Sequence, residues 1–235
     1  MQVEGTKSTF KQRWHWNKRA PLRGFFNVLM RILGRLLLRL RFIDLQNVPM
    51  HGPAILMINH VSWADPFLVL IGVHRSIVAM AKVETFEDLR TRWMVEPYGT
   101  IPVHRGSVDV QAIRSAAEVL REGGLVLISP EGTRSKTGAL IPAQEGFAFL
   151  ATRTNTPVVP IAIVGTKNIL PALKRLRRAD VTVTFGKPFE MNTNGKKINR
   201  TELQVFTLDA MYRLAALLPA EMRGVYGDAP PEKKV

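Results

Sequence analysis

Residues 108–135 read VDVQAIRSAAEVLREGGLVLISPEGTRS and bring a helix, a strand and a polar loop into direct succession. The spacing of apolar residues over 108–121 predicts a helix, which Gly123 and Gly124 end. The apolar run 125–128 follows at once and predicts a buried strand. This succession is typical of α/β domains, in which polar loops after the strands carry the functional groups.

The same alternation runs through residues 44–225. Apolar runs bounded by Gly and Pro predict strands at 54–58, 77–80, 100–103, 125–128, 158–164 and 181–185. Helical spacing or length predicts helices at 66–72, 108–121, 144–152 and 202–218. We therefore predict a single α/β domain over 44–225, with a largely parallel or mixed sheet flanked by helices. Residues 226–235 are expected to form a flexible tail.

The composition is that of a globular protein with a strong positive charge. Of 235 residues, 46% are hydrophobic and 22% charged, which excludes disordered and collagen-like classes. The formal net charge of +14 calls for an acidic partner such as nucleic acid, an anionic membrane surface or phosphorylated substrates. The chain contains no cysteine, which excludes disulfides, thiolate metal sites and a cysteine nucleophile.

Residues 1–43 are predicted to form a basic arm that associates with a membrane. The stretch 24–43 reads GFFNVLMRILGRLLLRLRFI, and its apolar runs are too short for a spanning helix. Arg31, Arg35 and Arg39 recur every four residues and predict a basic stripe along an amphipathic helix, with apolar residues on its other faces. Such a helix is typical of the bilayer interface, where basic residues also attract anionic lipid. The alternative is an ordinary surface helix packed on the core of its own domain.

The first polar cluster, Asn59 to Pro66, follows the predicted strand 54–58. His60 and Asp65 suit a general base and the carboxylate that orients it, because an imidazole accepts a hydroxyl proton near neutral pH. The spacing alone is weak, since His104 and Asp109 also lie five residues apart. A surface or capping interaction is the alternative for either pair.

Two further clusters follow predicted strands and contain arginine. One is GTIPVHRG, residues 99–106, and the other is SPEGTRS, residues 129–135. Arg105, Arg134 and Lys82 each lie near a strand end and could converge on one phosphate, because guanidinium groups match phosphate oxygens. Each alone could also be a solvated surface charge, but three such loops around one candidate base favour a shared site.

Together these blocks resemble the glycerolipid acyltransferases typified by 1-acylglycerol-3-phosphate acyltransferase. NHVSWADP is similar to the Asn-His-x4-Asp motif of that family. GTIPVHRG, SPEGTRS and VPIA (residues 159–162) are similar to its second, third and fourth blocks, in the same order. The resemblance covers roughly residues 40–190, and four ordered motifs make it specific. The chain departs from the family at Glu145, where relatives more often carry a basic residue, and in its arginine-rich amino-terminal element.

The resemblance implies a role for each matching residue. His60 would deprotonate the acceptor hydroxyl with support from Asp65, and no acyl-enzyme would form. Arg105 and the loop of Glu131, Gly132, Thr133 and Arg134 would bind the acceptor's phosphate, with Lys82 contributing. Five further motif residues would support the site: Asn59, Gly99, Pro130, Ser135 and Pro160.

The implied reaction moves a fatty acyl group from acyl-CoA or acyl carrier protein to the hydroxyl of 1-acylglycerol-3-phosphate, giving phosphatidate. The expected partners are a lysophospholipid acceptor, the acyl carrier and an anionic membrane surface at the cytoplasmic face, with no cofactor and no metal. Within the class, the acceptor could instead be glycerol-3-phosphate, another lysophospholipid, or a lipid amine or hydroxyl. A nucleic-acid-binding module is disfavoured because no reader motif is present. A catalytically dead lipid-binding protein is disfavoured because His60 and Asp65 are both present.

Overall fold

The computed structural model describes residues 20–104, 109–191, 193, 196 and 198–227. Within them, a seven-stranded sheet has the order β1-β7-β6-β2-β5-β3-β4. Its strands are β1 (Leu38–Ile43), β2 (Ala54–Ile58), β3 (Ile77–Lys82), β4 (Ile101–Val103), β5 (Leu125–Ile128), β6 (Val158–Val164) and β7 (Ala179–Phe185). The helices are α1 (Ala20–Leu37), α2 (Asp65–Gly72), α3 (Glu84–Glu87), α4 (Leu89–Val95), α5 (Val110–Arg121), α6 (Gly146–Thr154), α7 (Ile169–Lys174) and α8 (Arg200–Ala215).

The sheet is mixed, with a parallel centre, as the sequence predicts. Strands β6, β2, β5, β3 and β4 pair in parallel with their neighbours. Strand β7 runs antiparallel to β6, and β1 runs parallel to β7. The carboxyl ends of these five parallel strands therefore meet at one edge, where the polar loops gather.

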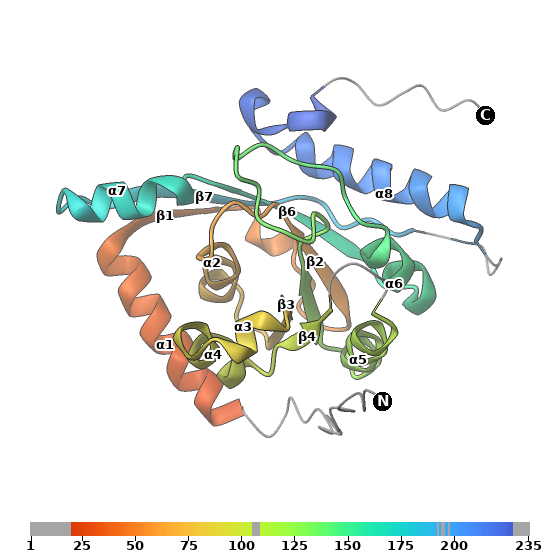
Figure 1. The fold of residues 1–235 in the computed structure, drawn as a ribbon, viewed down its shortest axis with the longest axis horizontal. Coiled ribbons are helices and arrows are strands. Elements are labelled where there is room, and N and C mark those ends of the chain that lie inside the picture. Colours follow the sequence, from red (N-terminus) through yellow and green to blue (C-terminus); the bar gives the residue numbers. More distant parts are fainter. Residues whose placement is uncertain (1–19, 105–108, 192, 194–195, 197, 228–235) are drawn as a thin grey trace, which may run out of the picture.

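Helices cover both faces of the sheet because its central strands are apolar on both sides. In β2, Ile55 and Met57 belong to one core cluster, and Leu56 and Ile58 to the other, as the two-residue period of a strand requires. Residues of α5, α6 and α8 complete the first cluster and residues of α2 the second. Figure 1 shows α5, α6 and α8 on one side of the sheet and α1 and α2 on the other.

The amino-terminal helix is shorter than predicted, and the arm does not end at residue 43. Helix α1 ends at Leu37, and the rest of the predicted helix is β1, paired with β7. The stretch LRLRFI alternates apolar and basic residues, which suits an edge strand half covered by the core. Arg178 stabilises the junction between α1 and β1, because its side chain donates hydrogen bonds to the carbonyl oxygens of Arg35 and Leu38. The α/β body therefore begins with β1.

The carboxyl-terminal boundary also moves. Tyr226 is buried, and its hydroxyl accepts a hydrogen bond from the backbone N–H of Ala143, so this residue belongs to the body and not to a tail. Residues 228–235, the rest of the predicted tail, lie outside the described residues. The short helices α3, α4 and α7 were not predicted, because segments of four to seven residues carry little periodicity.

Candidate active site

His60 follows β2 at the edge where the parallel strands end. The loop after β5, residues 129–135, lies at the same edge and contacts His60 directly. Lys82 ends β3 in register with Val103 of β4, so it lies at this edge as well. Arg105, which follows β4 in the sequence, lies outside the described residues. The structure thus brings together the predicted base, the third motif and Lys82 at one end of the sheet.

Asp65 orients the imidazole of His60. Its Oδ2 lies 3.0 Å from His60 Nδ1 and also accepts hydrogen bonds of 2.7 Å from the backbone N–H groups of Val61 and Ser62. An oxygen that accepts from backbone N–H groups is an unprotonated acceptor, so Nδ1 of His60 must carry the hydrogen that it shares with Asp65. In the neutral imidazole the other ring nitrogen, Nε2, then carries the lone pair that a general base requires.

Glu131 holds the backbone of His60. Its Oε1 accepts a 2.9 Å hydrogen bond from the His60 N–H, and its Oε2 accepts one of 3.1 Å from the Ile141 N–H. The side chain is buried, and this burial raises the pKa of Glu131 against the opposing effect of the two hydrogen bonds. Both carboxylate oxygens therefore bind the backbone of the protein itself.

Ser135 completes the support of His60 from the same loop. Its N–H donates to the His60 carbonyl oxygen at 2.8 Å, while its buried hydroxyl donates to the Ala139 carbonyl oxygen at 2.6 Å. Gly132 turns the loop with φ +64°, a value that favours glycine. Thr133 and Arg134 follow it with exposed side chains, so these two residues of the motif can reach a bound molecule.

The remaining motif residues have structural roles. Asn59 is buried and bridges to β6, since its side-chain amide donates to the Ile163 carbonyl oxygen at 2.9 Å and accepts from the Ile163 N–H at 2.7 Å. Pro160 lies buried within β6, in register with Met57 of β2. The carbonyl of Pro130 accepts a 2.8 Å hydrogen bond from Gln144. Gly99 has φ +63° just before β4.

Comparison with known proteins identifies the family. The family model described as acyltransferase matches residues 39–164. This chain belongs to the acyltransferase family. It is 32% identical over 149 residues to the chloroplastic 1-acyl-sn-glycerol-3-phosphate acyltransferase BAT2 of Brassica napus, covering 61% of this chain and 43% of the relative. It is also 32% identical over 155 residues to the 1-acyl-sn-glycerol-3-phosphate acyltransferase of Cocos nucifera, covering 62% and 49%.

A solved structure supports the fold. The crystal structure of the 1-acyl-sn-glycerophosphate acyltransferase PlsC from Thermotoga maritima matches with a TM-score of 0.61 and 23% identity, covering 81% of this chain and 78% of that one. At this identity the likeness shows the acyltransferase fold. The matched part of each of the two plant relatives is about half of its length or less.

The second His–Asp pair of this acyltransferase has nearly the same contact as the first. Asp109 Oδ2 lies 2.8 Å from Nδ1 of His104, whose side chain is 75% exposed. Asp109 also caps α5 by accepting a 2.9 Å hydrogen bond from the Ala112 N–H. Desolvation acts to raise the pKa of Asp109, but its hydrogen bonds outweigh it and the pKa is lowered. This pair therefore caps a helix at the surface.

A groove adjoins the loop that follows His60. Its lining comes from that loop, from the third motif and from the segment after β6: Val61, Ser62, Trp63, Ala64, Arg134, Thr166, Lys167, Ile169 and Leu170. Thr166 and Lys167 were not singled out from the sequence. Their position directly after an apolar strand, like that of His60, is the signal that could have identified them.

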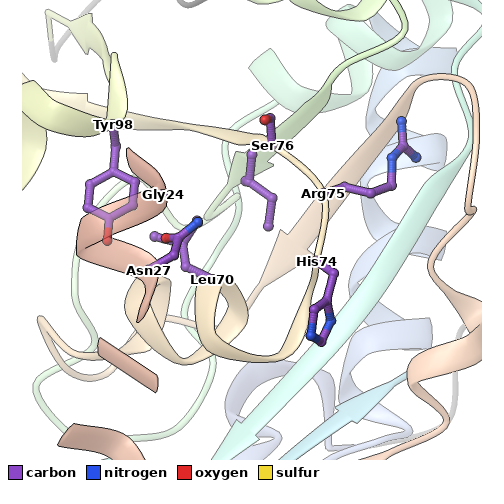
Figure 2. Close-up of a pocket in the computed structure, with 8 residues that line it drawn as sticks. Gly24, Asn27, Leu70, His74, Arg75, Ser76 and Tyr98 are labelled. Carbon is purple, nitrogen blue, oxygen red and sulfur yellow. The ribbon is translucent and has the colours of Figure 1, made fainter. Parts of the chain in front are cut away.

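A second cavity lies near the amino end of β3, opposite the end that carries Lys82. Ile77, the first residue of β3, lines it together with Gly24 and Asn27 of α1. Figure 2 shows Asn27 and Tyr98 pointing toward one another across this space. Burial raises the pKa of Tyr98 to about 12, so its hydroxyl stays protonated at neutral pH. This cavity is separate from the edge that carries His60.

Helix α1 presents its apolar side outward. Phe25, Ile32 and Leu36 are 65%, 51% and 65% exposed. On the inner side, Arg31 donates a 3.2 Å hydrogen bond to the Ile71 carbonyl oxygen, and a Cβ at Gly34 would lie 2.9 Å from the Ile71 side chain. Among the described residues, no helix combines the length and the apolar character that crossing a bilayer requires.

The structure corrects the predicted basic stripe at Arg39, which lies on a strand and not on the helix. Arg31 faces α2, and Arg35 is exposed on α1. Arg39 lies on β1 and pairs with Asp180 at 3.7 Å. Arg31 and Arg35 are thus both on α1, and only Arg39 leaves the helix, because α1 ends at Leu37.

Proposed function

We propose that this acyltransferase moves a fatty acyl group from an acyl thioester, acyl-CoA or acyl carrier protein, to the hydroxyl of 1-acylglycerol-3-phosphate and so forms phosphatidate. The observation that carries the proposal is His60, whose Nδ1 is bound to buried Asp65 and whose Nε2 is left as a base. The names of the plant relatives, 1-acyl-sn-glycerol-3-phosphate acyltransferases, support this acceptor.

In the proposed reaction, His60 Nε2 takes the proton of the acceptor hydroxyl while the hydroxyl oxygen attacks the thioester carbonyl carbon. The tetrahedral intermediate then collapses, the carbon–sulfur bond breaks, and the leaving thiolate receives the proton from His60. The carboxylate of Asp65 stabilises the imidazolium that forms between these steps. Because Asp65 is fully buried, solvent ions screen this attraction little.

The acceptor's phosphate is proposed to bind basic residues at the same edge of the sheet. Arg134 is exposed and lines the groove beside the motif loop, and Lys82 is exposed at the end of β3. Arg105 joins this proposal on the family resemblance alone. The reaction uses the acyl thioester as co-substrate, and the proposal includes no cofactor, no metal and no nucleic acid.

The enzyme is further proposed to associate peripherally with an anionic membrane at the cytoplasmic face. The outward apolar side of α1, with Phe25, Ile32 and Leu36, fits the acyl region of a bilayer interface. The net charge of +14 favours anionic lipid, which is found in the cytoplasmic leaflet. Both proposed lipids, the acceptor and phosphatidate, are amphiphiles that a membrane surface holds.

The test is incubation of the purified protein with lysophosphatidate and labelled acyl-CoA or labelled acyl carrier protein. The expected result is labelled phosphatidate from one of the two donors, lost in His60→Ala. Parallel reactions contain glycerol-3-phosphate, a zwitterionic lysophospholipid, or a lipid amine as acceptor. Faster transfer to one of these than to lysophosphatidate would replace the proposed acceptor.

A further inference from the structure

Thr166 and Lys167 lie beside the catalytic loop because β6 is the neighbour of β2. The two strands run parallel, with Ile58 in register with Ile161, and the Asn59 side chain extends the pairing to Ile163. Three residues beyond Ile163, the chain reaches Thr166. The segment after β6 therefore lies at the same edge as the segment after β2.

Gly165 sets the direction of these two residues. It has φ +97°, and a Cβ at this position would lie 2.2 Å from the carbonyl oxygen of Asp180. No other residue fits this turn without moving backbone. The packing of Gly165 against β7 therefore determines the direction in which the chain continues to Thr166 and Lys167.

The hydroxyl of Thr166 is an unused hydrogen-bonding group in the wall of the groove. Thr166 is 3% exposed, and its Oγ1 has no hydrogen-bond partner among the described residues. Buried hydroxyls are normally paired, since an unpaired one lowers stability. Oγ1 itself is shielded from solvent, but Thr166 lines the groove, and a turn of its side chain would direct the hydroxyl toward a bound ligand.

Lys167 places a positive charge next to Arg134. Its Nζ donates a 3.1 Å hydrogen bond to the Lys136 carbonyl oxygen, two residues beyond Arg134. The ammonium packs over Gly138, where a Cβ would lie 2.6 Å from Nζ. One of its three N–H donors is used in this bond, which leaves two for a ligand. Arg134 and Lys167 line the same groove, and none of the described residues that line it carries a carboxylate.

The rest of the groove's lining is mostly apolar. Trp63 and Leu170 line the groove and are each about half exposed. Ile169, the first residue of α7, lines it as well. A groove whose lining combines two cations and a hydroxyl with apolar groups is complementary to an anionic amphiphile.

We propose that Thr166 and Lys167, together with Arg134, form the subsite that holds the phosphate monoester of the acyl acceptor, with Trp63 and Leu170 along its acyl chain. This inference rests on the proposed function and adds two specificity residues from the segment after β6. A phosphate of the acyl donor is the competing occupant, and the experiment separates the two.

The experiment compares Lys167→Gln and Thr166→Val with wild type, using short-chain lysophosphatidate below its micelle concentration. Lys174→Gln, an exposed lysine at the end of α7, is the matched charge control. Lys167 is an exposed side chain outside the core, so folding should be retained, and circular dichroism checks this. Loss of one charge-assisted hydrogen bond should raise the KM for the acceptor about tenfold in Lys167→Gln, with the donor's KM unchanged. Lys167→Arg should restore the KM for the acceptor to the wild-type value.

Thr166→Val separates a ligand role from a structural one. Valine has the shape of threonine, and the lost hydroxyl has no protein partner, so the melting temperature should stay the same or rise. The KM for the acceptor should nevertheless increase several-fold. A melting temperature that rises with no change in the acceptor's KM would remove Thr166 from the subsite.

Binding of 2-deoxylysophosphatidate, which lacks the acceptor hydroxyl, is measured in the same variants. Weaker binding in Lys167→Gln supports the subsite even if lysophosphatidate proves not to be the substrate that is acylated. An increase in the donor's KM alone would assign the groove to the donor and overturn the inference. Equal binding and turnover in wild type, Lys167→Gln and Lys174→Gln would overturn it too, while the proposed function would stand.

Discussion

The fully buried carboxylate of Asp65 lies 3.0 Å from Nδ1 of His60, whose side chain is 21% exposed. Asp109 and His104 have the same spacing and a contact of 2.8 Å, but that histidine is 75% exposed. The two pairs therefore differ in their surroundings and not in their contact. Only His60 has its backbone held by Glu131 and Ser135.

His60→Ala should lower kcat at least about a hundredfold, because general-base catalysis typically contributes 10²–10⁴ in rate. His104→Ala is the matched control and should change kcat only mildly, because His104 belongs to a helix cap. Circular dichroism checks that both variants fold. A large loss in His104→Ala together with a small one in His60→Ala would overturn the catalytic assignment.

Asp65→Asn should lower kcat almost as much as His60→Ala while the fold persists. Oδ2 makes the side-chain hydrogen bonds of Asp65, and Oδ1 has no partner among the described residues, so an asparagine can keep its oxygen at Oδ2 and its NH₂ at Oδ1. The neutral amide no longer stabilises the imidazolium. The double variant should be scarcely slower than His60→Ala, because the two residues act as a unit. Additive losses would show that Asp65 acts independently of His60.

Arg134→Ala should lower kcat/KM toward lysophosphatidate about 10- to 150-fold, the effect of losing one charged hydrogen-bond partner worth roughly 1.5–3 kcal/mol. Arg105→Ala is expected to do the same on the family resemblance. A neutral monoacylglycerol should be a poor acceptor for wild type and no poorer for the variants. Equal losses on both acceptors would mean that the arginines maintain structure or bind the acyl donor.

Glu131 should make stability depend on pH in a direction opposite to that of an ion-paired carboxylate. Its pKa in the folded protein is raised above 4.5, so the folded state binds the proton more tightly than the unfolded chain. The stability that Glu131 contributes is therefore fully present below pH 4.5 and is lost as the pH rises through the pKa of the folded state. The free energy of unfolding of wild type relative to Glu131→Gln should therefore fall over this range. Glu118→Gln, at an exposed glutamate of α5, is the control and should show no such trend.

The apolar side of α1 should control membrane binding. Replacing Phe25, Ile32 and Leu36 by Gln should weaken sedimentation with anionic vesicles, since each exposed apolar side chain would lose its burial among acyl chains. Val205→Gln on α8, which is also exposed, should have no effect. Arg31→Gln should instead lower the melting temperature, because Arg31 bonds the carbonyl of Ile71. Unchanged vesicle binding in the triple variant would contradict the proposed interface.

The sequence alone determined those features that depend on neighbouring residues. Strands β2, β5 and β6 have the predicted bounds, because each is a short apolar run that ends in a polar or glycine-containing loop. The His60–Asp65 contact was predicted because five residues at the start of a helix suffice to bring the side chains together. Four ordered motifs then indicated the family that the comparison shows.

The tertiary structure decided the features that join distant parts of the chain. Glu131 contacts the His60 backbone across 71 residues, so its buried role was hidden within a motif that reads as a surface loop. Residues 38–43 became a strand because β7, about 140 residues away, offers an edge, although Arg39 also continues the four-residue spacing of Arg31 and Arg35 that suits a helix. Thr166 and Lys167 reach the groove because β6 pairs with β2. Local periodicity contains no information about which strands become neighbours, and that choice depends on the packing of the whole core.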